Sequence, residues 1–357
     1  MTEGSGVDAD LLPPAGGHVA LVLLTGIGDV VHGLPLANAL KSHRPDLELT
    51  WIAEPAPAQV LEHHPAVARR VVFRKSDGLR GVAALYGDLR KLRPFDLTIN
   101  AQRYFKSIFP TLFTGAPIRV GLARDKTRDG VSFFNTHHLP SGPWKHTQDI
   151  FLDFLPVLGL PRPDTPTWNI TFSTEEDEAA RRFFETLPKG PRVGIVVGTA
   201  NPAKDWPTRR YPPLVDALAE ELGYSVVLLG GPDPRERAVA HRVHREARSK
   251  PVDALADTVR ELMWKIRGLD LLVSPDTGPL HIARALEIPV VGLYGHSNPW
   301  RVGPYRAYEE LVVDRYTDPG EPPDPSRYEP RSQRMELITV EDVLERVMIA
   351  RERYAVA

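Results

Sequence analysis

Two apolar segments, each running directly into a polar loop that contains glycine, constrain the fold of this chain most. The first is HVALVLL at 18–24, followed by TGIGD at 25–29; the second is VGIVV at 193–197, followed by GTANPAKDWP at 198–207. An uninterrupted apolar run of this length is typical of a strand buried on both faces of a parallel sheet. The sequence therefore predicts two parallel sheets, each with a polar loop at the end of an early strand.

Strands alternate with helical patterns throughout the first half, as a parallel sheet covered on both faces requires. The helix after the first loop contains Pro35, and proline is favourable only in a helix's first turn. That helix starts either at Asp29, with a kink, or near Pro35, and the sequence leaves both open. The strands are predicted at 18–24, 48–53, 71–73, 96–100 and 119–122, and further helices at 56–63, 79–92, 103–113 and 147–158.

The second half repeats this logic, so we predict two domains, as expected for 357 residues. The Pro-rich stretch 160–167 is the predicted linker, and Ser173 with Glu176 forms a capping box that opens the next helix. Two doubly wound Rossmann-like domains facing across a cleft are expected. The predicted divisions are a disordered tail over 1–17, domains over 18–166 and 167–335, and a last helix within 336–357 that packs back toward the first domain. Second-half strands are predicted at 193–197, 225–229, 269–273 and 288–294, and helices at 211–222, 234–247, 258–267, from Pro279, and at 339–352.

Composition excludes several classes of site and location. Cysteine is absent, which removes disulfides and cysteine-ligated metals. No apolar run reaches the roughly 18 residues that span a bilayer, and the first residues do not form a secretory signal. We therefore expect a cytoplasmic protein, peripheral on the inner face of the membrane at most, with no nucleic-acid partner.

Charge is unevenly distributed along the chain. The formal net charge is −2, yet ten basic and three acidic residues lie between Arg69 and Lys106, a local excess of seven positive charges. This segment could attract an anionic partner, or it could be a set of solvated helix faces.

The motif SPDTGPLH at 274–281 is the clearest chemical signal. It follows an apolar strand and opens a helix, with Pro279 expected at the first helical position. Backbone N–H groups at Thr277 and Gly278 would then point outward with the helix dipole behind them, which suits a diphosphate. His281 could add a hydrogen bond or a charge. An ordinary capped helix with a surface histidine would show the same motif.

Two long strings resemble the signatures of the heptosyltransferase family of inverting glycosyltransferases. They are VSPDTGPLHIARALEIPVVGLYGHSNPWRVGPY in the second half and LLTGIGDVVHGLPLANALKSHRPDLELTWIAE in the first. The likeness extends loosely from His18 to Leu344. It implies a GT-B fold, ADP-heptose as the donor, no metal or other cofactor, and an anionic saccharide or glycolipid acceptor, such as the lipopolysaccharide inner core, at the inner-membrane surface.

The same resemblance assigns roles to individual residues. Asp29 would deprotonate the acceptor hydroxyl, and Lys204 would neutralise charge on the departing ADP. Glu236 would lie near the nucleotide ribose, and the local basic excess adds Arg103 and Lys106 as acceptor-binding candidates. Ala200, and a tail without cysteine, depart from the family pattern. The remaining donor-binding candidates are Thr199, Asp276, Thr277, Gly278 and His281.

Each assignment has a simpler competitor. Asp29 could be only a helix N-cap, and Lys204 only a solvated lysine. His241 and His244 have metal-compatible spacing but no evident third ligand. An NAD-dependent oxidoreductase would use Gly26-x-Gly28 and the acid Glu54, although valine occupies the third glycine position. The same fold would also suit a GT-B enzyme with another nucleotide-sugar, or a catalytically inactive protein that only binds one.

Overall fold

The computed structural model describes residues 11–354 and 356. By contacts it divides into two units, one of residues up to 143 with 147–171, and one of 144–146 with 172–357. The division at 171/172 lies close to the predicted 166/167. The segment 144–146 was not expected in the second unit; there Trp144 packs its ring against Tyr328 at 5.2 Å between centroids.

The predicted disordered tail was wrong for residues 11–17, whereas residues 1–10 lie outside the described part of the chain. Leu11 is only 6% exposed. Arg44 Nη1 and Nη2 donate to the carbonyl oxygens of Pro13 and Pro14, both at 3.1 Å. These contacts explain why a Pro- and Gly-rich segment packs against the domain.

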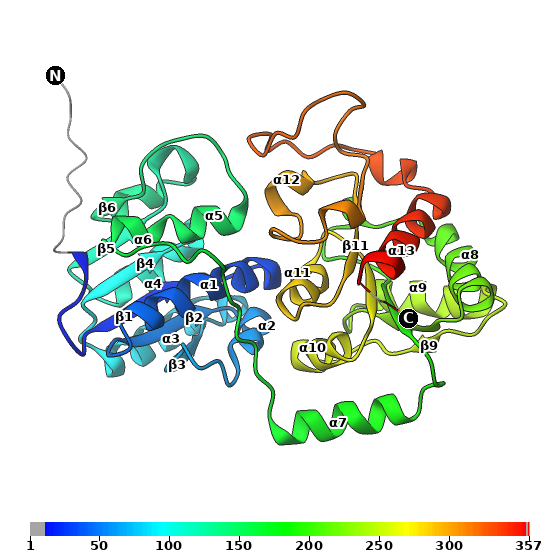
Figure 1. Ribbon diagram of the computed structural model, residues 1–357. Helices are drawn as coiled ribbons and strands as arrows, with labels where there is room; N and C mark the ends of the chain where they lie inside the picture. Colours follow the sequence, from blue (N-terminus) through cyan, green and yellow to red (C-terminus); the bar gives the residue numbers. More distant parts are fainter. Residues whose placement is uncertain (1–10, 355, 357) are drawn as a thin grey trace. The chain divides into compact units, whose positions relative to one another are not determined.

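Within the described residues, the first unit contains one six-stranded parallel sheet in the order β3-β2-β1-β4-β5-β6 (Figure 1). Strand β1 pairs with β2 and β4, with Leu21 opposite both Trp51 and Ile99. These central strands are buried and apolar, as the sequence predicted. The strands are β1 (His18–Val22), β2 (Glu48–Ala53), β3 (Arg69–Val72), β4 (Leu97–Asn100), β5 (Ile118–Gly121) and β6 (His137–His138).

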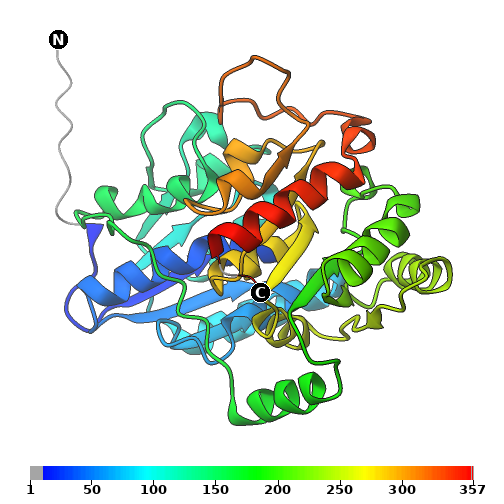
Figure 2. The same ribbon diagram turned by 45° about the vertical axis from the view of Figure 1, so that its right-hand side comes forward.

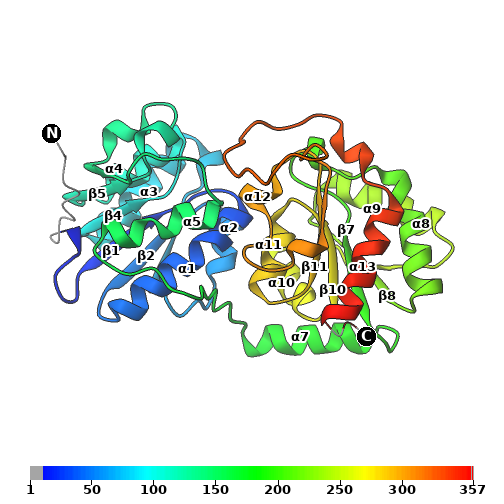
Figure 3. The same cartoon turned by 45° about the horizontal axis from the view of Figure 1, so that its top comes forward.

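Two groups of helices cover this sheet. Helix α1 (Ile27–His43) packs with α2 (Pro55–Ala58), α5 (Thr147–Leu152) and α6 (Phe154–Val157), whereas α3 (Leu79–Leu92) packs with α4 (Ile108–Phe113) (Figure 3). The predicted helices at 56–63 and 103–113 are each shorter, because a 3₁₀ turn forms part of the segment.

Helix α1 runs without interruption from Ile27 to His43, with Pro35 inside it. The start is therefore two residues before Asp29, which was the earlier of the two starts that the sequence left open. Residues 30–40 of the helix are all buried. An interior proline costs a helix about 3 kcal/mol, and burial of this many side chains offsets that cost.

The second unit repeats the topology, with a six-stranded parallel sheet over its described residues in the order β12-β11-β10-β7-β8-β9. Figure 2 shows the last helix of the chain, in red, lying along strands of this sheet. Helices α8 (Tyr211–Asp216), α9 (Pro234–Glu246) and α13 (Val340–Tyr354) form one group, and α7 (Thr174–Glu185), α10 (Val259–Arg267) and α11 (Gly278–Ala285) another. The strands are β7 (Arg192–Val196), β8 (Ser225–Leu229), β9 (Val252–Asp253), β10 (Leu271–Pro275), β11 (Val290–Tyr294) and β12 (Val312–Asp314).

Two expectations for the second unit were wrong. The strand at 288–294 was the last one predicted, but β12 pairs beyond β11, with Leu293 opposite Val313. The last helix was expected to pack toward the first domain. Instead α13 belongs to the second unit and contacts α8, β11 and β12, burying Val343, Val347 and Ala350.

Candidate functional site

Each sheet reverses its strand order at one point, between β1 and β4 in the first unit and between β7 and β10 in the second. In open α/β sheets, ligands bind beyond the carboxyl ends of the strands at such a switch point. The loops that follow these four strands carry nearly all the candidate residues from the sequence. Asp29, Arg103 and Lys106 follow β1 and β4, and Thr199, Lys204 and residues 276–281 follow β7 and β10.

A buried carboxylate forms the centre of the second unit's site. Lys204 Nζ donates to Asp276 Oδ2 at 2.6 Å, and Ser297 Oγ donates to the same oxygen. His281 Nε2 lies 3.4 Å from Asp276 Oδ1. The structure therefore brings Lys204, Asp276 and His281 together, and adds Ser297, which lies in the signature string of the second half but was not among the candidate residues.

Electrostatics keep this carboxylate ionised. Burial opposes ionisation of Asp276, but Lys204 and His281 outweigh it and hold the pKa of Asp276 well below its usual range. Asp276 in turn holds the ammonium group of Lys204 in place. The Lys204 side chain remains 28% exposed. Lys204 is therefore not simply a solvated lysine.

The N-terminus of α11 adjoins the carboxylate. Thr277 is the N-cap, and its side chain makes no capping hydrogen bond. The helix starts at Gly278, so Pro279 occupies the second helical position rather than the expected first. The first N–H groups of a helix have no intrahelical acceptor and attract anions. Thr277 and Gly278 are partly exposed, which leaves this end accessible.

Thr199 is engaged within its own loop. It is 2% exposed, and its hydroxyl lies 2.7 Å from Asp205 Oδ1, which also accepts from Thr199 N–H at 2.8 Å. Burial raises the pKa of Asp205, although the hydrogen bonds from Thr199 act to lower it. These contacts hold the loop that carries Lys204 in shape.

Glu236 lies in the first turn of α9, beside the ends of β7 and β8. Its Oε2 accepts a hydrogen bond from the N–H of Gly231. A Cβ on Gly198 would lie 2.7 Å from Glu236 Cγ, and one on Gly230 would lie 2.6 Å from Oε2. Two glycines therefore make room for this carboxylate. Burial raises its pKa.

In the first unit, Asp29 lies in the first turn of α1 but is not its N-cap. The cap is Gly26, with φ of 83°, where a Cβ would lie 2.7 Å from Asp29 Oδ2. Glycine is thus required there both by its conformation and by the returning carboxylate. The simple N-cap explanation for Asp29 was wrong, because the helix starts two residues earlier, at Ile27.

Lys106 points toward the same loop. Its Nζ donates to Thr25 Oγ1 and lies 3.5 Å from Glu54 Oε1, and Lys75 approaches that oxygen at 3.6 Å. Burial lowers the pKa of Lys106, while Glu54 and Asp29 act in the opposite direction. Glu54 thus pairs with two lysines. These pairs argue against Glu54 as the acid that binds the ribose in an NAD-dependent oxidoreductase.

Arg103 is engaged with the chain after β5. Its Nε donates to the carbonyl oxygen of Lys126 at 2.8 Å, and its guanidinium lies over the Tyr104 ring at 5.7 Å. Much of the basic excess is also compensated by acids outside the segment. Arg69 pairs with Glu48 and Arg70 with Glu62.

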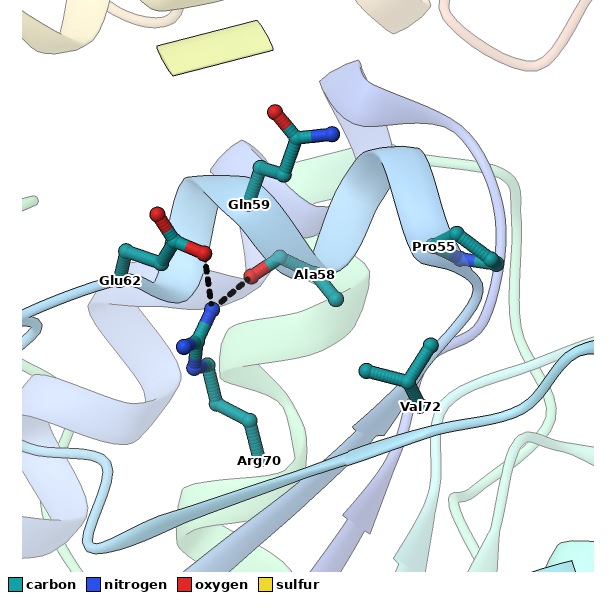
Figure 4. Close-up of a pocket in the computed structure, with 6 residues that line it drawn as sticks. All are labelled: Pro55, Ala58, Gln59, Glu62, Arg70 and Val72. Carbon is teal, nitrogen blue, oxygen red and sulfur yellow. Dashed lines mark hydrogen bonds and ion pairs between the residues drawn. The ribbon is translucent and has the colours of Figure 1, made fainter. Parts of the chain in front are cut away.

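A separate hollow of about 320 Å³ lies at the β3 edge of the first unit (Figure 4). Arg70 Nη1 crosses it to donate to the Ala58 carbonyl at 3.1 Å and to Glu62 at 2.8 Å. None of the predicted site residues lines it. Elsewhere His241 and His244 are exposed on α9, and no group of three or more metal-ligating residues occurs in the described part of the chain.

The chain is similar to known proteins of one family in sequence and in fold. The family model for glycosyltransferase family 9 (heptosyltransferase) matches residues 83–320. Lipopolysaccharide core heptosyltransferase OpsX of Haemophilus influenzae is 26% identical over 295 residues, 82% of this chain and 83% of the relative. The solved glycosyltransferase family 9 protein of Veillonella parvula matches with a TM-score of 0.81 and 23% identity, covering 96% of this chain and 99% of that one. E. coli heptosyltransferase WaaC with ADP matches with a TM-score of 0.71 and 22% identity over 93% and 99%.

Proposed function

The chain belongs to glycosyltransferase family 9, the heptosyltransferases, and from that membership we infer that it transfers heptose from ADP-heptose to an anionic saccharide. The acceptor class that we favour is a glycolipid such as the lipopolysaccharide inner core. The observation that carries the proposal is the cluster of Lys204, Asp276 and His281 at the α11 N-terminus.

The donor diphosphate would bind at this cluster. N–H groups at Thr277 and Gly278 would donate to its oxygens, and Lys204 would supply the countercharge as ADP departs. A carboxylate repels phosphate, so Asp276 would act by holding Lys204 and His281 in position. Solved E. coli WaaC carries ADP, which supports an adenine nucleotide as the leaving group.

The ribose would lie beside Glu236, whose carboxylate is already placed against the ends of β7 and β8. Thr199 would contribute by keeping its loop in shape and not by contacting the donor, because its hydroxyl is already hydrogen-bonded to Asp205. Burial raises the pKa of Glu236 and of Asp205. Hydroxyl groups that donate hydrogen bonds to these carboxylates would lower both pKa values again.

Asp29 would take the proton from the acceptor hydroxyl as that oxygen attacks the anomeric carbon. Attack opposite the departing diphosphate would invert the configuration at that carbon. Lys106 and Arg103 would contact acidic groups of the acceptor; the support is stronger for Lys106, because Asp29 acts to raise its pKa.

The direct test is to incubate the protein with ADP-heptose and a Kdo-containing lipid A precursor. Acceptor-dependent release of ADP, with an acceptor mass increased by one heptose, is expected. Parallel reactions with UDP-glucose and GDP-mannose test other nucleotide-sugar donors. Transfer from one of these and none from ADP-heptose would refute the donor assignment; tight ADP binding without transfer would indicate an inactive binding protein.

Metal independence is tested in the same assay. We expect activity to persist in excess EDTA, because protein groups would neutralise the leaving diphosphate. Loss of activity in EDTA, with recovery on addition of Mg²⁺, would contradict that part of the proposal.

A further inference from the structure

Several large hydrophobic side chains of the first unit lie exposed. Leu79 is 87% exposed, Phe133 83% and Phe105 53%. Single exposed hydrophobic residues are common, but a contiguous group marks an interaction surface.

These side chains belong to elements that touch one another. Helix α3 packs against α4, and α4 also contacts the 3₁₀ turns η4 (Phe105–Ser107) and η6 (Val131–Phe134). Ring contacts connect Tyr86 to Phe113 at 5.2 Å, Phe113 to Phe109 at 5.9 Å and Phe109 to Phe105 at 5.9 Å. We call this set the aromatic patch: Leu79 and the rings of Tyr86, Phe105, Phe109, Phe113 and Phe133, of which Phe109 and Phe113 are partly buried and Phe113 also packs against the core of the unit.

Basic side chains accompany the aromatic patch. Residues 74–93 carry six basic and two acidic residues, an excess of four positive charges. Arg74, Arg80 and Arg90 form no ion pair within the described residues. Arg93 lies 6.0 Å from the centre of the Tyr86 ring. Aromatic residues mixed with arginine and lysine characterise segments that bind the lipid–water interface.

The aromatic patch also adjoins the acceptor-side residues. Phe105 precedes Lys106, whose Nζ contacts Thr25 and Glu54 at the end of the first sheet. The patch is therefore next in the chain to a lysine that contacts the loop before Asp29.

We propose that the aromatic patch docks the first unit on a bilayer surface rich in anionic phospholipids. The aromatic rings would enter the headgroup region, and Arg74, Arg80 and Arg90 would lie against lipid phosphates. The inference extends the proposed function, since it supplies a glycolipid acceptor from that surface. No helix in the described residues is long and apolar enough to cross a membrane, so the expected attachment is interfacial.

The test is sedimentation of the full chain with vesicles of phosphatidylcholine and phosphatidylglycerol, and with phosphatidylcholine alone. Binding is expected to the mixed vesicles, with at least about tenfold weaker affinity for the neutral ones and in high salt. The double variant Leu79→Ser/Phe133→Ser is expected to bind mixed vesicles at least about tenfold more weakly. The matched control is Leu337→Ser/Met348→Ser, which changes two side chains of the second unit that are each 50% exposed.

The proposal is overturned if the wild-type chain ignores anionic vesicles, or if both double variants bind alike. Association of the wild-type chain with itself or with another protein through these residues, without vesicle binding, would likewise refute it. Vesicle binding needs neither donor nor acceptor, so the result does not depend on the proposed reaction. If that reaction holds, Leu79→Ser/Phe133→Ser should use a deacylated, water-soluble acceptor as well as the wild type does.

Discussion

At the scale of single residues, Asp29 is the first assignment to test. It lies in the first turn of α1, folded back over Gly26, which forms the cap. Asp29→Asn keeps the size but cannot accept the acceptor's proton, so kcat should fall by about 10²–10⁴-fold while ADP still binds. Steady-state kinetics and ADP titration measure the two effects.

A control for Asp29→Asn is Asp177→Asn, which changes an acid in the first turn of another helix. Each variant should lose about 0.3–1 kcal/mol of helix-dipole stabilisation, and Asp177→Asn also loses an exposed ion pair with Arg267. If Asp29→Asn retains normal turnover and only melts earlier, as the control should, Asp29 is a structural residue.

Lys204 is the corresponding test of the donor side. Removing its ammonium eliminates the charge beside the α11 N-terminus and the ion pair with Asp276. Lys204→Ala should lower kcat/KM by at least about tenfold, or about 1.4 kcal/mol. Lys189→Ala, at an exposed lysine of the same unit, should leave it unchanged. Equal kinetics for the two variants would argue against the role of Lys204.

The lowered pKa of Asp276 has a consequence for stability. A carboxyl whose pKa is lower in the folded state contributes stability above its unfolded pKa of about 3.9, and this stability is lost as pH falls. Asp276→Asn should therefore be less stable than the wild type at pH 7, and the difference should shrink below about pH 5. Urea unfolding of both proteins at several pH values measures it. A difference that is constant with pH would indicate a contribution other than ionisation.

At the scale of elements, the N-terminus of α7 shows how one predicted motif does more than cap a helix. The capping box forms: Ser173 N–H donates to Glu176 Oε2 at 2.8 Å, and Glu176 N–H donates to Ser173 Oγ at 3.3 Å. Glu176 also accepts from Arg260 Nε of α10 at 2.6 Å, and the Arg260 side chain is only 7% exposed. The motif thus fixes α7 against α10.

Substitution should separate these two contributions. Ser173→Ala should lower the free energy of unfolding by about 1 kcal/mol, the usual effect of a lost N-cap. Glu176→Ala should cost more, because a buried guanidinium also loses a carboxylate partner. Urea unfolding checks the order, and turnover should be unchanged in Ser173→Ala. Equal costs would mean that the pair with Arg260 contributes little.

At the scale of the whole molecule, the two units repeat one topology, yet their switch points carry different chemistry. The second unit places Lys204 and His281 around a carboxylate, and the first places Asp29 near Lys106. ADP should therefore stabilise the protein through the second unit, by about 2.7 kcal/mol at 100 times Kd. Thermal unfolding with and without ADP should show this shift in Asp29→Asn and a smaller one in Lys204→Ala. A shift lost in Asp29→Asn alone would place the nucleotide in the other unit.

The sequence by itself determined the fold class and most of the elements. The apolar runs of β1, β2, β7 and β8 appear where they were predicted, to within two residues, because buried parallel strands require such runs. The edge strands β6, β9 and β12 were missed. They have two or three residues each and only one neighbour, so their pairing is set by the sheet and not by a local pattern.

The candidate site divides in the same way. Asp29 and Lys204 were named from the family resemblance of their loops, whereas the segment with Asp276 and His281 was also indicated by a motif between an apolar strand and a helix. Only the tertiary structure placed Ser297, 21 positions beyond Asp276, on the same carboxylate oxygen. It also showed that Glu54 pairs with Lys75 and Lys106, so that this acid, with Glu48 and Glu62, offsets three of the seven excess positive charges in the local sequence. The residues that pair with a given charged side chain follow neighbouring strands of the sheet. The order of those strands is decided by packing of the whole sheet and not by a local sequence pattern.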